Sequence, residues 1–243
     1  GEVAVNGISV NKPGSQVDEN ADIKVSAPRI NYVSRGGLKL EGAARYFQVS
    51  FEGKTVLDIG ASTGGFTDYA LQNGAKRVYA VDVGYGQLDW SLRNDPRVVV
   101  KERTNVRYLA PEDLGEPVDI VTMDVSFIST TLIFPVIKKL LKADGEVVSL
   151  IKPQFEAGKD KVGKKGVVKD AAVHAEVLLN CIAHAQDAGL NLRGVHFSPI
   201  TGPQGNIEFF VYLSGQLDPM PDIPGLVREV VAQAHTVLEA KTR

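Results

Sequence analysis

The sequence lacks most features of secreted and membrane-spanning chains. Its single cysteine, Cys181, cannot form an internal disulfide, which fits a reducing compartment and predicts a cytoplasmic protein. No segment approaches the ~20 consecutive apolar residues of a membrane-spanning helix, and residues 1–10 do not resemble a secretory signal. The net charge is only −2, from 27 Lys and Arg against 29 Asp and Glu. Any polyanionic partner therefore needs a local basic patch.

The remaining composition is that of an ordinary globular protein. The chain has 243 residues, of which 44% are apolar and 23% charged, which excludes a disordered, collagen-like or disulfide-scaffold protein. The four histidines are scattered without ligand spacing, so no metal site is predicted. We expect one large domain with a small appendage.

Apolar runs alternate with amphipathic segments from residue 36 onward. Strands are expected at 55–60, 77–82, 97–102, 118–124, 145–151, 192–200 and 208–214. Helices are expected at 36–48, with Ser34 as a cap, and at 64–73, 86–94, 131–142, 170–189 and 223–241. This alternation predicts an α/β fold with a mostly parallel sheet covered by helices on both faces. The last two strands are joined by a short loop and must pair antiparallel, as in class I, Rossmann-like methyltransferases.

Residues 1–25 form short alternating segments separated by Asn-Gly and Pro-Gly turns. This segment is too short to be a domain and resembles half of a small one. The chain begins inside such an element, so we expect further residues before Gly1. Pro28 marks a linker, which places the predicted domains at 1–27 and 28–243.

A glycine-rich loop follows the first strand of the main domain. Ser62 stands where a dinucleotide-binding fingerprint requires glycine. Asp58, at the strand end, would repel a pyrophosphate but attract the ammonium group of S-adenosylmethionine, and Asp82 ends the next strand at a position suited to ribose hydroxyls. The sequence therefore predicts S-adenosylmethionine as the cofactor. The predicted cofactor-binding residues are Asp58, Gly60, Ala61, Ser62, Gly64, Gly65, Phe66, Asp82, Asn105, Val106 and Asp124.

Further charged residues converge on the same edge of the predicted sheet. Asp124 and Lys152 end the fourth and fifth strands, and Glu208 begins the last strand, which starts where its parallel neighbours end. The residues after the fourth strand, DVSF, differ from the Asn/Asp-Pro-Pro-aromatic motif of amine methylation. Cytosine C5 methylation needs a reactive thiolate, whereas Cys181 lies in an apolar helix and is predicted to be a buried structural thiol.

Lysines with carboxylates suit methylation of a hydroxyl, which must lose a proton before it attacks. A second lysine nearby disfavours the charged form of a lysine base, and carboxylates orient both side chains. We expect Lys152 to be the base, with Asp124 and Glu208 as orienting groups. Lys39 would be a partner that positions the hydroxyl or lowers the pKa of Lys152, although spacing alone does not place it at this edge.

Five motifs together resemble a known family. They are SRGGLKL (34–40), DIGASTGGFTD (58–68), MDVSFIS (123–129), KPQFE (152–156) and KGVVKD (165–170). They resemble the TlyA, or haemolysin A, family of ribosomal RNA methyltransferases, which are FtsJ-like. The resemblance implies a catalytic tetrad of Lys39, Asp124, Lys152 and Glu208, and 2′-O-methylation of cytidine in ribosomal RNA or ribosomal subunits. It also implies that residues 1–27 are the remnant of an S4-type RNA-binding domain.

The segment 152–169 carries six lysines against two acidic residues. Its position after the proposed catalytic strand predicts a phosphate-contacting lid rather than a merely solvated loop. The predicted RNA-binding residues are Arg35, Lys159, Lys161, Lys164 and Lys165. Aromatic residues for base stacking are sparse, and the candidates are Phe127, Phe155, Tyr85 and Trp90.

Two other functions remain open on the sequence. A cytolytic activity, suggested by the family name, is disfavoured because no membrane-spanning or strongly cationic amphipathic segment is visible. A non-catalytic RNA-binding protein with a vestigial methyltransferase domain is disfavoured because the tetrad and glycine loop are intact. Lysis of erythrocytes tests the first alternative, and cofactor binding without methyl transfer would favour the second.

Overall fold

The computed structural model describes residues 3–12, 14–26, 31–216 and 220–240, in two compact units. The first unit is Gly1–Asn31 and the second is Tyr32–Arg243. The sequence-predicted boundary between residues 27 and 28 lies outside the described residues.

The first unit is a small antiparallel sheet with strand order β2-β1-β3. Its strands are β1 (Val3–Val5), β2 (Ile8–Ser9) and β3 (Ile23–Val25). Asn6 and Gly7 both have positive φ, at 50° and 81°, as the predicted Asn-Gly hairpin turn requires. Ile8 and Val25 remain 71% and 67% exposed, so three short strands bury little apolar surface.

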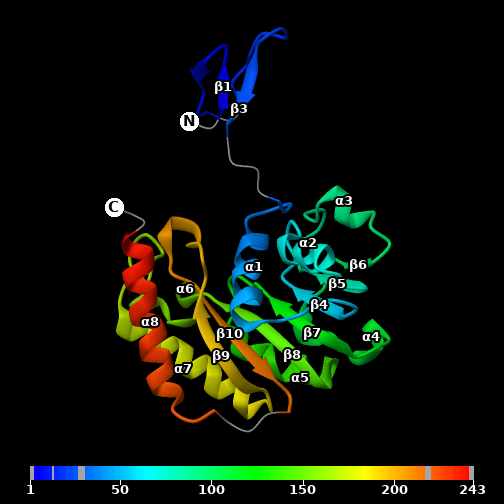
Figure 1. The fold of residues 1–243 in the computed structure, drawn as a ribbon, viewed down its shortest axis with the longest axis vertical. Coiled ribbons are helices and arrows are strands. Elements are labelled where there is room, and N and C mark those ends of the chain that lie inside the picture. Colours follow the sequence, from blue (N-terminus) through cyan, green and yellow to red (C-terminus); the bar gives the residue numbers. More distant parts are fainter. Residues whose placement is uncertain (1–2, 13, 27–30, 217–219, 241–243) are drawn as a thin grey trace. The chain divides into compact units, whose positions relative to one another are not determined.

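The second unit is built around a seven-stranded sheet with strand order β6-β5-β4-β7-β8-β10-β9 (Figure 1). The strands are β4 (Thr55–Ile59), β5 (Arg77–Val81), β6 (Val98–Lys101), β7 (Val118–Met123), β8 (Leu141–Ile151), β9 (Asn191–Phe197) and β10 (Phe209–Ser214). Strands β4 to β8 pair in parallel, and β10 is antiparallel to both β8 and β9. The predicted α/β class and the antiparallel last strand are confirmed.

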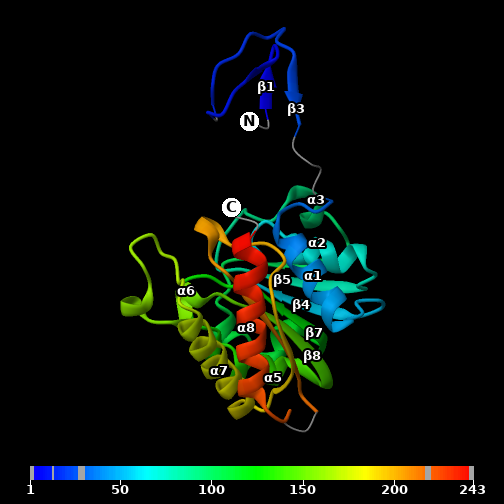
Figure 2. The same cartoon turned by 60° about the vertical axis from the view of Figure 1, so that its left-hand side comes forward.

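Helices cover both faces of this sheet (Figure 2). The α-helices are α1 (Gly36–Phe47), α2 (Gly65–Gln72), α3 (Trp90–Arg93), α4 (Pro111–Leu114), α5 (Phe134–Leu140), α6 (Pro153–Glu156), α7 (Ala171–Asp187) and α8 (Ile223–Ala240). Short 3-10 turns are η1 (Val106–Tyr108), η2 (Thr130–Leu132), η3 (Lys159–Lys161) and η4 (Pro203–Gly205).

Alternation along the strands divides the core in two. Val56 and Ile120 pack with α1 and α2, whereas their neighbours Leu57 and Val121 pack with α5, α7 and α8. Successive side chains of a strand point to opposite faces, so both faces are apolar and the central strands are buried. This burial leaves the strand ends as the place for polar chemistry.

Two predicted helices have wrong bounds. The helix expected at 86–94 is reduced to Trp90–Arg93, because Gly86 adopts a positive φ and the Asp89 side chain caps the later start by accepting from Ser91 N–H. The helix expected to reach residue 142 ends at Leu140, because Leu141 already pairs with Val118 of β7. Neither change moves the strand ends that form the site.

Candidate active site

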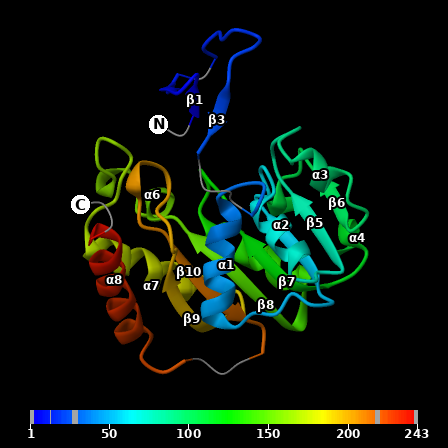
Figure 3. The same cartoon turned by 45° about the horizontal axis from the view of Figure 1, so that its top comes forward.

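The residues singled out from the sequence adjoin the strand ends at the carboxyl edge of the sheet, and Figure 3 shows the course of these strands. Gly60 follows β4, Asp82 follows β5, Asp124 follows β7 and Lys152 follows β8. Glu208 precedes β10, whose first residue, Phe209, pairs with Ile151 at the end of β8. The antiparallel direction of β10 therefore brings Glu208 to the same edge, as predicted.

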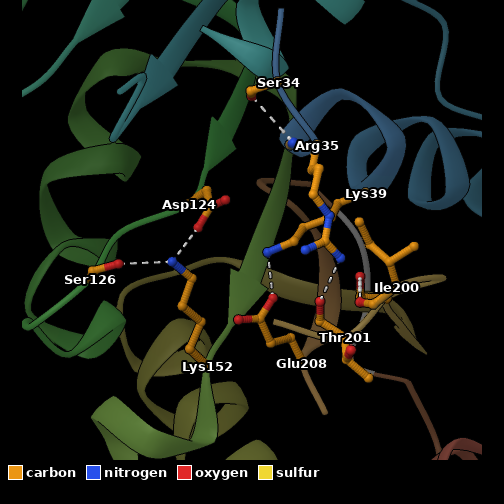
Figure 4. A network of polar contacts seen from close by, with 11 residues as sticks. Ser34, Arg35, Lys39, Asp124, Ser126, Lys152, Ile200, Thr201 and Glu208 are labelled. Atoms are coloured by element: carbon orange, nitrogen blue, oxygen red, sulfur yellow. Dashed lines mark hydrogen bonds and ion pairs between the residues drawn. The ribbon is translucent and has the colours of Figure 1, made fainter. Parts of the chain in front are cut away.

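Two lysine–carboxylate pairs stand at this edge (Figure 4). Lys39 Nζ lies 2.5 Å from Glu208 Oε2, and Lys152 Nζ lies 2.6 Å from Asp124 Oδ1. Lys152 Nζ also donates to Ser126 Oγ at 2.9 Å. Lys39 is only 8% exposed and Glu208 is fully buried. The structure thus brings all four predicted catalytic residues to one place, including Lys39, which spacing alone did not locate.

Three members of these pairs line one cavity, which we call the lysine pocket, of about 460 Å³. Lys39, Asp124 and Lys152 contribute to its wall, and Glu208 lies behind Lys39. Ser34, Arg35, Gly60, Ala61, Ser62, Gly65, Phe66, Ser126 and Gly202 also line it. Three of the lining residues, Ala61, Gly65 and Phe66, were predicted to bind a cofactor.

A second cavity, the strand-end pocket, has a volume of about 330 Å³. It is lined by Asp82, Asn105 and Val106, as predicted, with apolar walls from Val83, Val125 and Phe127. Gly60, Ser62, Asp124 and Ser126 line both pockets. The two cavities therefore adjoin at Asp124, so a ligand in one pocket can lie beside a ligand in the other.

The Asp82 carboxylate is already fixed by two backbone groups. Oδ2 accepts from Ser62 N–H at 2.8 Å, and Oδ1 accepts from Gly84 N–H at 2.7 Å. Each carboxylate oxygen has about two acceptor positions. Asp82 therefore keeps acceptor capacity for a hydroxyl group in the strand-end pocket.

Two glycines of the loop are required by close contacts. A Cβ on Gly60, whose φ is +82°, would lie 2.5 Å from the Asp124 carbonyl oxygen. A Cβ on Gly65 would lie 2.3 Å from Ser34 Oγ. Gly64, with φ +103°, is the residue that precedes α2 and packs against Leu92. It lines neither pocket, so its contribution is to the turn rather than to the wall.

Asp58 lies beneath the pockets instead of on their walls. It is 1% exposed, and its carboxylate accepts from Thr67 Oγ1 at 2.7 Å and Thr122 Oγ1 at 3.0 Å. Burial raises the pKa of Asp58 to about 6, although the two hydroxyl hydrogen bonds oppose the shift. Asp58 lines neither pocket, and direct contact with a cofactor ammonium group stays a prediction. Its charge would act from behind the glycine loop.

Glu208 is packed against the loop that precedes β10. A Cβ on Gly202 would lie 2.1 Å from Glu208 Oε1, so the loop before β10 rests directly on the carboxylate. That loop is in turn fixed by Asn206, which is buried and whose Oδ1 accepts from Val168 N–H at 3.2 Å. Asn206 Nδ2 donates to Gly166 O at 3.0 Å. No motif or spacing indicated Asn206 beyond its place in a turn.

The predicted RNA-binding residues are distributed over different surroundings. Arg35 lines the lysine pocket and donates to Thr201 O at 3.3 Å (Figure 4). Lys159 lines a groove with Phe127, Gln154 and Phe155. Lys161 is ion-paired with Glu176 of α7 at 2.5 Å. Lys164 and Lys165 are exposed and belong to no ion pair among the described residues.

Phe127 is the most exposed of the candidate stacking residues. Its side chain is 90% exposed, its φ is +62°, and its ring centroid lies 4.8 Å from that of Phe155. The ring lines the strand-end pocket, and backbone strain of this kind clusters at functional sites. Tyr85 and Trp90 are also exposed, at 68% and 77%.

Cys181 is buried in α7, and burial raises the pKa of its thiol to about 12. Such a thiol is a weak nucleophile, so the prediction of a buried thiol is confirmed. Within the described part of the chain, no group of three or more His, Cys, Asp or Glu side chains is arranged to hold a metal ion. Among the same residues, none of the helices has the length and hydropathy needed to cross a bilayer.

The glycine loop, the carboxylate after β5 and the paired lysines agree with one family. A model of the family described as FtsJ-like methyltransferase matches residues 32–214. This chain belongs to the FtsJ-like methyltransferase family. The match covers the second unit from its first residue to the end of β10 and includes all four residues of the lysine–carboxylate pairs.

Relatives of this FtsJ-like chain agree over most of its length. A Bacillus subtilis protein named rRNA methyltransferase YqxC is 51% identical over 96% of this chain and 84% of its own length. The 16S/23S rRNA (cytidine-2′-O)-methyltransferase TlyA of Mycobacterium tuberculosis is 47% identical over 93% of this chain and 85% of its own. A solved Streptococcus thermophilus protein described as a hemolysin has TM-score 0.88 at 47% identity, and covers 100% of this chain and 89% of its own.

The FtsJ-like enzymes are S-adenosylmethionine-dependent methyltransferases, and the residues present fit that cofactor. The strand-end pocket has a carboxylate with acceptor capacity at Asp82, apolar walls at Val83 and Val106, and an amide at Asn105. These are suitable partners for ribose hydroxyls and an adenine ring. The buried carboxylate of Asp58 supplies a negative charge behind the loop for a cationic group.

Proposed function

We propose that this enzyme methylates the 2′-hydroxyl of a cytidine in ribosomal RNA. The two lysine–carboxylate pairs at the junction of two adjoining pockets are the observation that carries the proposal. The TlyA relative, 47% identical, is named for this reaction on 16S and 23S rRNA. The substrate proposed for this chain, ribosomal RNA, is found where ribosomes are assembled, so we propose that the enzyme acts in the cytoplasm.

The cofactor and the substrate ribose would occupy neighbouring pockets. The strand-end pocket suits S-adenosylmethionine, through Asp82, Asn105 and Val106. The lysine pocket is larger and carries Arg35, Lys39 and Lys152 on its wall. Three cationic groups around one cavity favour a ligand with phosphates. The ribose of a target nucleotide, flanked by its phosphates, meets that requirement.

The chain's own residues would move one proton. S-adenosylmethionine, when bound, would supply an electrophilic methyl group, whose bond to sulfur would break as the new bond to oxygen forms, with a thioether as the leaving group. Lys152 Nζ would take the proton from the 2′-hydroxyl, and the hydroxyl oxygen would form the new bond to carbon. Asp124 Oδ1 and Ser126 Oγ fix the position of Nζ at 2.6 and 2.9 Å. Lys39, oriented by Glu208, would supply positive charge beside the developing oxyanion.

We also propose that the first unit is part of an S4-type RNA-binding domain. Its two hairpin strands and a third strand form a sheet that leaves Ile8, Ile23 and Val25 more than half exposed. Such a sheet is too small to form a core of its own. The second unit would then carry the chemistry, and the first would contribute to RNA contact.

Labelled S-adenosylmethionine and undermethylated ribosomal subunits test the proposed function. Nuclease digestion locates the labelled nucleotide, and resistance of its phosphodiester bond to alkali assigns the label to the 2′-oxygen. Label on a base would leave the fold assignment intact but contradict the proposed mechanism. Cofactor binding without transfer to ribosomal RNA or subunits would contradict the proposed substrate.

A further inference from the structure

Glu156, the last residue of α6, joins two segments that both carry site residues. Its Oε2 accepts from Ser129 Oγ at 2.6 Å, and its Oε1 accepts from Thr130 N–H at 2.8 Å and from Thr130 Oγ1 at 2.9 Å. Among the described residues no lysine or arginine forms an ion pair with Glu156. We call this group of three hydrogen bonds the clasp.

The clasp is the last of three contacts that connect the loop after β7 with the turn after β8. At one end, Lys152 is paired with Asp124. In the middle, the rings of Phe155 and Phe127 are in contact, with centroids 4.8 Å apart. At the other end stands the clasp of Glu156. Fixing both ends of two short segments also fixes what lies between them.

The turn that carries Lys152 needs such an anchor. Helix α6 is only four residues long, and a single turn is not stable without outside contacts. Hydrogen bonds to an ionised carboxylate are stronger than neutral ones, and three of them converge on one side chain. Loss of the clasp would therefore loosen the Lys152 amine and the Phe127 ring together, while the strands beneath stay packed.

We propose that Glu156 is a positioning residue for methyl transfer, which acts through the clasp on Lys152 and Phe127. The inference rests on the proposed function, in which Lys152 is the base. Glu156 lies in the KPQFE motif, but no role was predicted for it. Glu156 lines neither pocket, so its effect on chemistry must be indirect.

Three variants separate positioning from charge. Glu156→Ala removes all three acceptor contacts. Glu156→Gln keeps the side-chain length and removes the charge. Its oxygen can still accept from Thr130, and its amide can donate to Ser129 Oγ. The double variant Ser129→Ala/Thr130→Val removes two donors and leaves Glu156 unchanged. Glu112→Ala, on the exposed face of α4, is the matched control, and Lys152→Ala reports on the proposed base.

The measurements are single-turnover methylation of ribosomal subunits, cofactor affinity, and hydrogen exchange of amides in residues 124–130. We expect Glu156→Ala to slow transfer by ~10- to 100-fold, since small misplacements of a reacting group cost that much. Its cofactor affinity should stay within about threefold and its loop amides should exchange at least about tenfold faster. Glu156→Gln should behave as the parent does. The variant Ser129→Ala/Thr130→Val should show the same defect. When it is combined with Glu156→Ala, transfer should be no slower than in Glu156→Ala alone.

Parent-like transfer and exchange in Glu156→Ala would overturn the inference. So would a Glu156→Gln variant as slow as Glu156→Ala beside an active Ser129→Ala/Thr130→Val, because charge rather than position would then matter. Hydrogen exchange tests the clasp without any substrate. Turnover that survives in Lys152→Ala would instead contradict the proposed function, so the two failures are distinguishable.

Discussion

Replacing Asp58 by Asn should make the protein more stable at neutral pH and weaken cofactor binding. Burial raises the pKa of Asp58 from 3.8 to about 6, so folding disfavours its charged form. As pH rises from about 4 to 6 the unfolded chain loses this proton first, and stability falls through that window. The full shift corresponds to about 3 kcal/mol above pH 6, at 1.36 kcal/mol for each pKa unit.

Asn at position 58 keeps the shape and the hydrogen bonds but carries no charge. Its oxygen can accept from one threonine hydroxyl, and its amide can donate to the oxygen of the other, Thr67 or Thr122. Urea unfolding at pH 4 and pH 7.5 measures the effect. We expect Asp58→Asn to gain up to about 3 kcal/mol at pH 7.5 and little at pH 4.

Calorimetry of S-adenosylmethionine binding completes the test of Asp58. Substitutions that stabilise a functional site commonly cost activity, and the Asp58 charge lies behind the glycine loop, so we expect affinity to fall about tenfold, or 1.4 kcal/mol. A variant that is less stable than the parent at pH 7.5 would refute the reasoning, because the threonine hydroxyls would then outweigh desolvation. Unchanged cofactor affinity would refute the functional half alone.

Two further substitutions test other parts of the site. Gly202→Ala should abolish most methyl transfer, because the new Cβ would lie 2.1 Å from Glu208 Oε1 and must displace the partner of Lys39; parent-like turnover would show that the pair tolerates displacement. Lys164→Ala/Lys165→Ala should weaken RNA binding and reduce its salt dependence by a slope of about 1.5, since each phosphate contact contributes ~0.7 to 0.9, as measured by filter binding from low to high salt. An unchanged slope would contradict the lid.

Much of the sheet followed from periodicity alone. The strands predicted at 55–60, 77–82 and 118–124 are present with bounds shifted by one residue, because central parallel strands are continuous apolar runs with sharp ends. Element ends that depend on tertiary pairing were wrong. Leu141 reads as helical by propensity but pairs with Val118, and the contact that decides this is remote in sequence.

The site residues divide in the same way, into those placed by their neighbours in the sequence and those placed by contacts remote in the sequence. Asp124 and Lys152 could be placed because they directly follow strands, and topology then sets their edge. Lys39 lies on a helix before the sheet, and only the resemblance indicated its place. The clasp of Glu156 joins segments 26 and 27 residues apart, which no periodicity in the sequence records.

Asp58 shows how a correct position can carry an incomplete role. The sequence placed a carboxylate at the end of β4, and it is there, but the hydroxyls of Thr67 and Thr122 cover it. Both threonines lie on elements whose side-chain directions depend on packing. Ser126 was not predicted as the hydrogen-bond acceptor of Lys152 for a similar reason. The orientation of the Ser126 side chain depends on the loop that the clasp fixes.

The most direct test of the account is the position of the methyl group in undermethylated ribosomal subunits treated with the parent enzyme and with Lys152→Ala. The account predicts label on the 2′-oxygen of a cytidine with the parent, and loss of transfer in Lys152→Ala at unchanged cofactor affinity. Label on a base, or full turnover in Lys152→Ala, would contradict it.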